Sequence, residues 1–485
     1  MRTFAERVAD LRVEGPLLVS DRSSPLGAAW LPDVAVGVDL AACGYGEWEY
    51  LLRGFAEVWT WDAGFRAQCI GERPFTTRVL VRRPLDPTRF SGSVQLEPHH
   101  PDDDRALTWA MIAPWILRGG HAHVGVTQEP ATVPDLRRFD PDRYERLQIV
   151  HSGQRWDILG LVAGAIRVGA LPAFEDLSVS CTVMSGWSMT GTFCRTFLGE
   201  GFHERCWYQG SPVIDGYVIC ISSGGAGRAG YARLGDAILP PDDARRTIGA
   251  HSVPIVELLS EGEAETHHSV LRADADGPQD RYRLYEVAGT GHVITGTPSL
   301  TTNRLQMERR GFPPLLREIN EKPSDARMDL VARAVFESME RWLRDGAVPP
   351  RAGRFAYADP TTDAPRGLMD GSLPLARDAD GNVLGGVRTP WIEVPAAAYL
   401  PHSTPRPGRC KPAPHAPYSD PVLLADLIAH MRPFDPPTLR RRYGSPARYL
   451  QRFEQSALQL CAAGWLLEAD LPELLDSRRT ACARF

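Results

Sequence analysis

The sequence lacks the features that mark several classes of protein. Its 54 basic and 60 acidic residues are spread along 485 positions, with no basic stripe and no long acidic tail, and the net charge is -6. A surface that binds phosphate groups needs clustered positive charge. Nucleic acid is therefore not an expected partner.

Signals for export, membrane insertion and metal binding are lacking as well. The nine cysteines stand singly, without a CxxC pair, which fits reduced thiols in the cytosol better than a disulfide framework or a zinc cluster. The first residues, MRTFAERVADLRVEGPLL, interleave charges with apolar residues and so lack the apolar core of a secretory signal. No segment approaches the apolar length that crosses a bilayer. We therefore expect a cytoplasmic protein with no membrane partner.

The chain has no internal repeat, and its pattern changes along the sequence. Period-two character at 47–61 and 77–83 predicts an N-terminal sheet edge. From Ser93 onward, apolar strands alternate with helices, which predicts a mostly parallel sheet covered by helices. An amphipathic helix at 325–344 is followed by a proline-rich, irregular region and a helical tail at 423–430 and 447–467. The expected strands lie at 93–97, 123–127, 179–184, 216–222, 253–260 and 282–289, and the expected helices at 107–117 and 157–168.

The string Ser-Gly-Trp-Ser-Met-Thr-Gly lies between an expected strand and an expected helix. A sharp strand-to-helix turn needs small residues before and after its central serine. Gly186 and Gly191 meet that need, with Thr190 in place of the commoner second glycine. An isolated match is more often a flexible turn, but the flanking strand and helix favour Ser188 as a nucleophile. The N–H of Met189, at the helix N-terminus, is then the first oxyanion donor.

A nucleophilic serine needs a base to take its proton and an acid to orient that base. In hydrolases with such an elbow, the order along the chain is serine, acid, histidine. The strand at 253–260 leads into Glu261 and Glu263, and we expect Glu263 to be the acid, with Glu261 as the close alternative. The strand at 282–289 leads into a glycine-rich loop that ends at His292, the expected general base.

The second oxyanion donor is expected in the loop after the strand at 93–97, which reads Glu-Pro-His-His-Pro. Proline has no N–H, so His99 or His100 is left. We assign His99 to the oxyanion hole and His100 to the substrate pocket. Other candidates for the pocket lining are aromatic, although core packing is the commoner role of any single one of them. They are Trp187, Trp207, Tyr208 and Trp391.

Several strings resemble ligand sites without meeting their requirements. The histidines at 99–100, 267–268 and 121/123 suggest a metal, but adjacent strand residues point to opposite faces and no carboxylate or thiol stands at ligand spacing. We predict no metal and no cofactor. Residues 224–230 are glycine-rich without a following Lys-Ser/Thr, and we interpret them as a flexible loop near the pocket. Residues 378–382 lack the ligand order of a calcium loop, and their Asp-Gly pair predicts a hairpin turn.

Longer strings carry a family resemblance. They are TTRVLVRRPLDPTRFSGSVQLE (76–97), GWSMTGTFCRTFLGEGF (186–202) with IDGYV (214–218), RLYEVAGTGH (283–292) and GNVLGGVRTPWIEVPAAAY (381–399). They resemble the bacterial and fungal family usually labelled "alpha/beta hydrolase domain-containing protein", from about residue 45 onward. The resemblance implies a carboxylic-ester hydrolase with Ser188, Glu263 and His292 at matching positions. Met189 and the His99–His100 pair depart from the polar residue and the asparagine expected there.

The sequence thus predicts an α/β-hydrolase fold: a mostly parallel central sheet flanked by helices, with an N-terminal β extension and a C-terminal helical or irregular extension. We expect a single domain over 1–485, made of a β-rich part (1–92), a catalytic core (93–300) and an extension packed on that core (301–485). The expected reaction is cleavage of a carboxylic ester or lactone through a Ser-His-Glu triad and an acyl-enzyme. An acyltransferase, an amidase or a non-catalytic binding protein with this fold stays open, as do the natural substrate and the oligomeric state.

Overall fold

The computed structural model describes most of the chain, and its contacts divide it into two compact units. The described residues are 2–20, 22–225, 230–235, 237–293, 299–314, 316–361, 364–411, 420–479 and 482. The first unit comprises Met1–Ile219, Arg228–Pro254 and Thr297–Pro314, and the second comprises Cys220–Gly227, Ile255–Gly296 and Leu315–Phe485. The organisation as a single domain stays a prediction.

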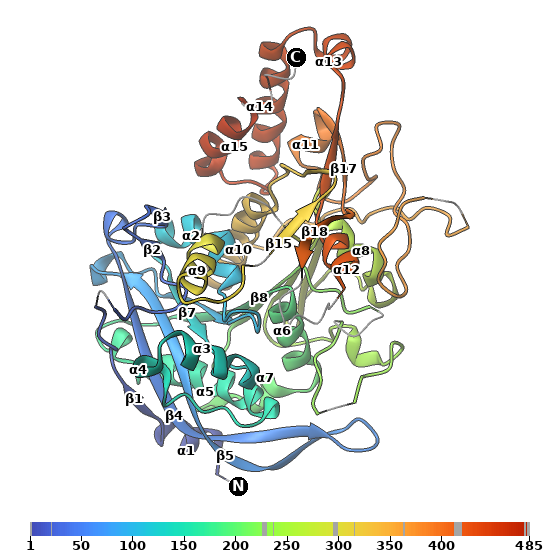
Figure 1. The fold of residues 1–485 in the computed structure, drawn as a ribbon. Coiled ribbons are helices and arrows are strands. Elements are labelled where there is room, and N and C mark those ends of the chain that lie inside the picture. Colours follow the sequence, from blue (N-terminus) through green and yellow to red (C-terminus); the bar gives the residue numbers. More distant parts are fainter. Residues whose placement is uncertain are drawn as a thin grey trace. The chain divides into compact units, whose positions relative to one another are not determined.

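The first unit is built on a sheet that changes its pairing from one side to the other. In spatial order its strands are β1 (Arg12–Glu14), β4 (Tyr45–Trp61), β5 (Ala67–Pro84), β7 (Ala122–Val126), β6 (Ser93–Pro98), β8 (Cys181–Trp187) and β11 (Gly216–Cys220). β4 and β5 form a long antiparallel ribbon, blue in Figure 1, and β5 also pairs antiparallel with β7. β6, in contrast, runs parallel to both β7 and β8. The predicted nucleophile therefore follows a strand in the parallel part.

Helices and short strands complete the first unit. The helices are α1 (Phe4–Ala9), α2 (Leu107–Gly119), α3 (Val133–Phe139), α4 (Pro141–Tyr144), α5 (Arg155–Arg167), α6 (Met189–Gly199), α7 (Phe202–Arg205) and α9 (Ser299–Arg309). The short strand pairs are β2 (Trp30–Leu31) with β3 (Val36–Gly37), and β9 (Trp207–Tyr208) with β10 (Ser211–Pro212). α2 packs on β7 and β8, and α6 packs on the strand that it follows.

One segment of the first unit corrects the expectation about apolar length. Ser152–Phe174, 23 residues that include α5, is long and apolar enough to cross a membrane by length and composition alone. However, 72% of its most apolar window is buried inside the fold. A Cβ added at Gly160 would lie 2.2 Å from Sγ of Cys206, so neighbouring chain packs directly on the helix backbone. Core helices of compact proteins share this character, and a single such helix is weak evidence for a membrane span.

The second unit contributes three strands to the fold in the order β12 (Ile255–Leu259), β14 (Asp280–Glu286) and β13 (Ala275–Gly277). β12 and β14 are parallel, whereas β13 returns antiparallel to β14. Helix α8 (Glu261–His267) begins directly after β12, and the chain beyond β14 leads to His292. Both strands therefore end in segments that carry predicted catalytic residues.

The rest of the second unit contains more regular structure than the sequence predicted. Its strands are β15 (Leu316–Ile319) paired with β18 (Pro405–Lys411), and β16 (Lys322–Pro323), β19 (His430–Pro433) and β17 (Ala397–Leu400) in that order. Its helices are α10 (Met328–Asp345), α11 (Pro390–Glu393), α12 (Pro421–Asp426), α13 (Pro436–Tyr443), α14 (Pro446–Ala462) and α15 (Leu471–Arg479). The helix predicted at 423–430 is wrong in its second half, since α12 ends at Asp426 and His430 begins a strand.

The predicted strands and helices of the core, in contrast, are all present. So is the helix at 325–344, which is α10 and is followed directly by Gly346 with a left-handed φ of +67°. The turn predicted at 378–382 is also confirmed: the N–H of Asp378 donates to the carbonyl of Asn382 at 2.8 Å, and Arg377 pairs with Val383 in an antiparallel bridge.

Candidate active site

Ser188 stands on a strained turn between β8 and α6. Its backbone has φ +63° and ψ -125°, a region that residues other than glycine rarely adopt. The turn is so tight that a Cβ at Gly186 would lie 2.2 Å from the carbonyl oxygen of Thr190. Strain of this kind costs about 1 to 3 kcal/mol and persists where surrounding contacts hold it, most often at functional sites.

Thr190 supplies those contacts. Its hydroxyl accepts the N–H of Trp187 at 2.7 Å and donates to the carbonyl of the same residue at 2.9 Å. The side chain thus closes the turn, which explains why threonine is suited to a position where glycine is commoner. Met189 is the first residue of α6, and the N–H of a first helical residue has no acceptor within its own helix.

Glu263 and His292 lie together in the second unit. Oε1 of Glu263 is 2.6 Å from Nδ1 of His292, and Oε2 accepts the hydroxyl and the N–H of Ser260. Both side chains are largely buried, with 8% of Glu263 and 17% of His292 exposed. Burial opposes ionisation of the carboxyl, but the interaction with His292 and the hydrogen bonds from Ser260 outweigh it and lower the pKa of Glu263. The carboxylate is therefore ionised and held in one orientation.

Glu261, the alternative acid, has other partners. It is fully buried at the start of α8, where Oε1 accepts the N–H of Gly289 at 2.7 Å and Oε2 pairs with Arg377 at 2.8 Å. Of the two glutamates that the sequence left open, Glu263 is the one whose carboxylate lies on His292.

The structure corrects the assignment of His99 as an oxyanion donor. Its N–H donates to the carbonyl of Val126 at 2.7 Å, and the N–H of His100 donates to Arg105 at 2.8 Å. Neither N–H is free for a substrate, because His99 continues the pairing of β6 with β7 past the end of the strand and His100 bonds within the loop that follows. The side chain of His100 accepts the N–H of Asp102 at 3.1 Å and thereby stabilises this loop.

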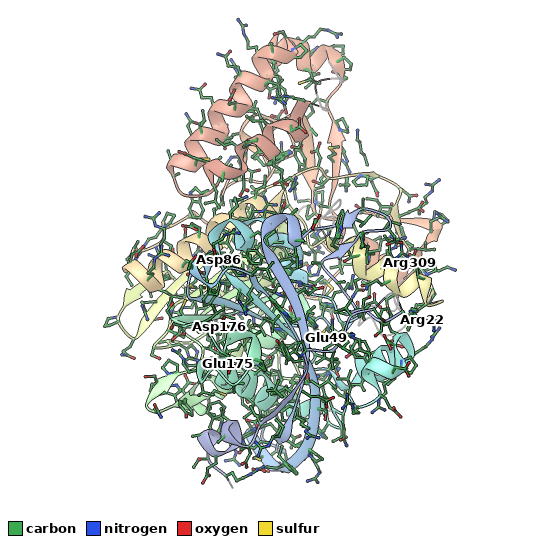
Figure 2. The ribbon with its side chains drawn as sticks, turned by 90° about the vertical axis from the view of Figure 1, so that its left-hand side faces the viewer. Arg22, Glu49, Asp86, Glu175, Asp176 and Arg309 are labelled. Carbon is green, nitrogen blue, oxygen red and sulfur yellow. The ribbon has the colours of Figure 1, made fainter. Side chains whose placement is uncertain are left out.

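The imidazole of His99 belongs to a buried network of charges. Its Nδ1 lies 3.2 Å from Asp104, whose carboxylate also accepts from Arg78. Arg78 in turn pairs with Glu49 of β4, which is labelled in Figure 2. Burial opposes ionisation of Asp104, yet His99 and Arg78 lower its pKa to about 2. His99 thus helps to join β4, β5 and the loop after β6.

The tryptophans predicted in the pocket have different surroundings. Trp187 is buried at the end of β8, next to the elbow, whereas Trp207 is 40% exposed. Trp391 is 1% exposed and packs edge-on against Phe453 at 5.4 Å, with the Arg478 guanidinium 5.6 Å from its ring. These are the contacts of a core residue, so the assignment of Trp391 to the pocket does not fit the structure.

The histidines considered as metal ligands each have separate neighbours. His267 lies 3.4 Å from Glu257, whereas Nε2 of His268 lies 2.9 Å from the carbonyl of Gly371. His121 stacks on Trp115 at 4.2 Å. Within the part of the chain that the structure describes, no group of three or more histidine, cysteine, aspartate or glutamate side chains could hold a metal ion.

Ser260 holds Glu263 and is a site residue beyond those that the sequence predicts. The spacing Ser-x-x-Glu at a helix start is the signature of a capping box and could have indicated this contact. The loop proposed at 224–230 lies partly outside the described residues, since 226–229 are not among them. Of its described part, Gly224 donates its N–H to Nδ1 of His267 at 3.1 Å.

A family model described as "Alpha/beta hydrolase domain" matches residues 13–476, nearly the whole chain. The chain belongs to this family. The fold class predicted from the sequence is thereby confirmed, and this α/β hydrolase carries its elbow and its Glu–His pair inside the matched region. A search of curated proteins finds no match.

Solved structures with some similarity include several hydrolases. A poly(3-hydroxybutyrate) depolymerase, LpqC from Bordetella parapertussis, is 13% identical, with a TM-score of 0.28, over 63% of this chain and 91% of its own. A thermostable esterase from Pseudomonas putida ECU1011 is 12% identical, with a TM-score of 0.30, over 60% and 90%. The dienelactone hydrolase from Anabaena variabilis ATCC 29413 is 14% identical, with a TM-score of 0.27, over 48% and 90%. Similarity at this level says nothing about substrate.

Proposed function

We propose that this α/β hydrolase cleaves a carboxylic ester or lactone, with Ser188 as nucleophile, His292 as general base and Glu263 as the acid that orients the base. The observation that carries the proposal is the strained backbone of Ser188. It lies between strand and helix in a turn that only glycine at 186 permits. Strain that is held by dedicated contacts, in a family of hydrolases, supports a catalytic role for this serine.

The Glu263–His292 pair supplies the base. Because Glu263 is an ionised acceptor, Nδ1 of His292 carries the proton between them, and Nε2 is left with the lone pair that can take a proton. When His292 becomes a cation during the reaction, the same carboxylate stabilises it. The pair therefore does what a Ser-His-acid mechanism requires of its second and third members.

The proposed reaction proceeds in two halves. Nε2 of His292 takes the hydroxyl proton of Ser188 while Oγ bonds to the ester carbonyl carbon, and the N–H of Met189 donates to the resulting oxyanion. His292 then protonates the departing alcohol, and an acyl-enzyme remains. Water, deprotonated by His292, attacks this ester and releases the acid and free Ser188. Since the N–H of His99 is bonded to Val126, the N–H of Met189 is the oxyanion donor in this proposal.

Labelling with a fluorophosphonate probe tests the proposal directly, because an activated serine displaces fluoride from the probe and is phosphonylated. We expect labelling of the wild type and of Ser185→Ala, a matched loss of a buried hydroxyl three residues before Ser188, but none of Ser188→Ala. Undiminished labelling of Ser188→Ala would exclude this nucleophile.

A panel of esters, lactones and amides of graded acyl length, with and without an alcohol acceptor, then separates hydrolysis of esters from amidase and acyltransferase activity. The cytoplasmic location stays a prediction.

A further inference from the structure

Glu261 makes a set of contacts that the proposed triad does not explain. It begins α8, the helix that carries Glu263, and it is fully buried. Its Oε1 accepts the N–H of Gly289, and its own N–H donates to the carbonyl of Thr290 at 3.2 Å. Gly289 and Thr290 lie in the short segment between β14 and His292. One glutamate thus binds, through side chain and backbone, the segment that carries the proposed base.

That segment is tightly packed on its other side. Gly289 has a left-handed φ of +83°, and a Cβ there would lie 2.7 Å from Cδ1 of Ile392. A Cβ at Gly291 would lie 2.7 Å from that of Ala429 and 3.1 Å from the carbonyl oxygen of Pro401. Small residues therefore let the segment pass between its neighbours, and the Glu261 contacts fix it on the side of α8.

Arg377 completes the arrangement. Its guanidinium pairs with Oε2 of Glu261 and donates to the carbonyls of Gly381 and Tyr399, both at 3.1 Å. A buried carboxylate costs much free energy unless a charge offsets it. Burial raises the pKa of Glu261, and the nearby Arg377 opposes that rise. The arginine, held by two carbonyls, keeps Glu261 available as an acceptor for Gly289.

We propose that Glu261, held by Arg377, is a positioning residue that fixes the Gly289–His292 segment against α8, so that the imidazole of His292 meets Glu263. This inference rests on the proposed function, in which His292 is the general base. It gives the two glutamates of the Ser-Glu-Gly-Glu string separate tasks. Glu263 contacts the imidazole, and Glu261 contacts the backbone that carries it.

The decisive variant is Glu261→Gln, which keeps the shape of the side chain. Both oxygens of Glu261 face donors, and an amide can accept through only one of its two atoms, so one contact turns repulsive. We expect kcat on an activated aryl ester to fall roughly 10- to 100-fold, the scale of an ångström-sized misplacement, with KM changed by less than about threefold. The matched control is Glu286→Gln, a buried glutamate at the end of β14 that accepts one N–H from Phe355. It should keep the wild-type rate.

A second measurement reports on position without requiring turnover. In protein with ¹⁵N-labelled histidine, the Nδ1 proton shared by His292 and Glu263 should give a low-field proton resonance, because the hydrogen bond is short and charge-assisted. Glu263→Gln identifies this resonance by its loss. We expect Glu261→Gln to shift it upfield or broaden it, and Glu286→Gln to leave it unchanged.

The outcomes are distinct. A wild-type resonance and a wild-type kcat in Glu261→Gln would overturn the positioning role, even if the triad is correct. If the wild type hydrolyses no ester, the proposed function fails, and the resonance alone still decides the inference. Should Glu261→Gln not fold, Arg377→Lys replaces it. The matched control is Arg283→Lys, since Arg283 is buried and, like Arg377, donates to backbone carbonyls. A shifted resonance in Arg377→Lys alone supports the role, and an unshifted one overturns it.

Discussion

The hydroxyl of Thr190 binds both backbone polar groups of Trp187, accepting the N–H at 2.7 Å and donating to the carbonyl at 2.9 Å. The two residues flank Ser188 and Met189, so this double contact holds the strained turn closed from within. The effect of these two hydrogen bonds can be separated from that of side-chain packing, because valine has the shape of threonine but no hydroxyl.

Thr190→Val should destabilise the protein by about 1 to 3 kcal/mol, because it leaves a buried N–H without an acceptor. It should also lower kcat, since the backbone of Ser188 is then less firmly held. Urea unfolding and aryl-ester kinetics measure the two effects. Thr190→Ser retains a hydroxyl, so its unfolding free energy and its kcat should stay close to those of the wild type. Equal losses in the serine and valine variants would show that the hydrogen bonds of the hydroxyl do not close the turn.

Replacing Ser188, the proposed nucleophile, should separate the effect of backbone strain from that of the hydroxyl. Both Ser188→Ala and Ser188→Gly remove the hydroxyl and should abolish turnover. At φ +63°, however, glycine is unstrained and alanine is not, so Ser188→Gly should be more stable than Ser188→Ala by about 1 kcal/mol. Thermal unfolding of the two variants checks this. Equal stability would mean that the turn relaxes once the hydroxyl is gone.

Glu263→Gln should cost far more activity than Glu261→Gln. The glutamine at 263 removes the charge that stabilises the His292 cation and also disturbs its tautomer, for which a loss of about 10⁴ in kcat is the expected scale. Steady-state kinetics of the two variants, with intact folding checked by circular dichroism, give the comparison. A larger loss in Glu261→Gln would make Glu261 the triad acid.

His402, whose side chain is 18% exposed, should make stability depend on pH. Burial disfavours charge on His402, but Glu265, 3.1 Å from its Nε2, and Asp426, 3.3 Å from its Nδ1, together raise its pKa to about 9. Since the folded pKa lies above the ordinary value of about 6.5, the cation stabilises the fold fully below pH 6.5, and the gain is lost as pH rises through about 9.

The variant His402→Gln isolates this contribution. The difference in unfolding free energy between wild type and variant should be largest below pH 6.5 and should shrink as pH approaches about 9. Urea titrations at a series of pH values measure it. A difference that does not change with pH would show that His402 is neutral in the folded protein.

Much of the core could be predicted from the sequence because its signals are local. Strands such as β6, β8 and β12 are short apolar runs bounded by turns, and the elbow at Ser188 needs small residues at fixed offsets. The capping box at Ser260 and Glu263 is equally local. These features depend on neighbours a few positions away, so the sequence alone displays them.

The misassigned residues depend instead on distant partners. His99 cannot donate its N–H because Val126, on another strand, already accepts it. Trp391 is in the core because Phe453, about sixty residues later, packs against it. Likewise β19 is a strand because it pairs with β16 and β17, which lie far earlier in the chain. No local pattern carries such information.

The contacts of Arg377 also set a limit on how far this hydrolase can be shortened. A chain ending at residue 300 would still contain Ser188, Glu263 and His292, the three residues of the proposed triad. It would lack Arg377, whose guanidinium offsets the buried charge of Glu261. Helix α8 would then begin with a buried carboxylate that no positive charge offsets. This carboxylate contacts the segment that leads to His292. We therefore expect the smallest working form of this hydrolase to extend past His292, the last residue of the proposed triad, and to include Arg377.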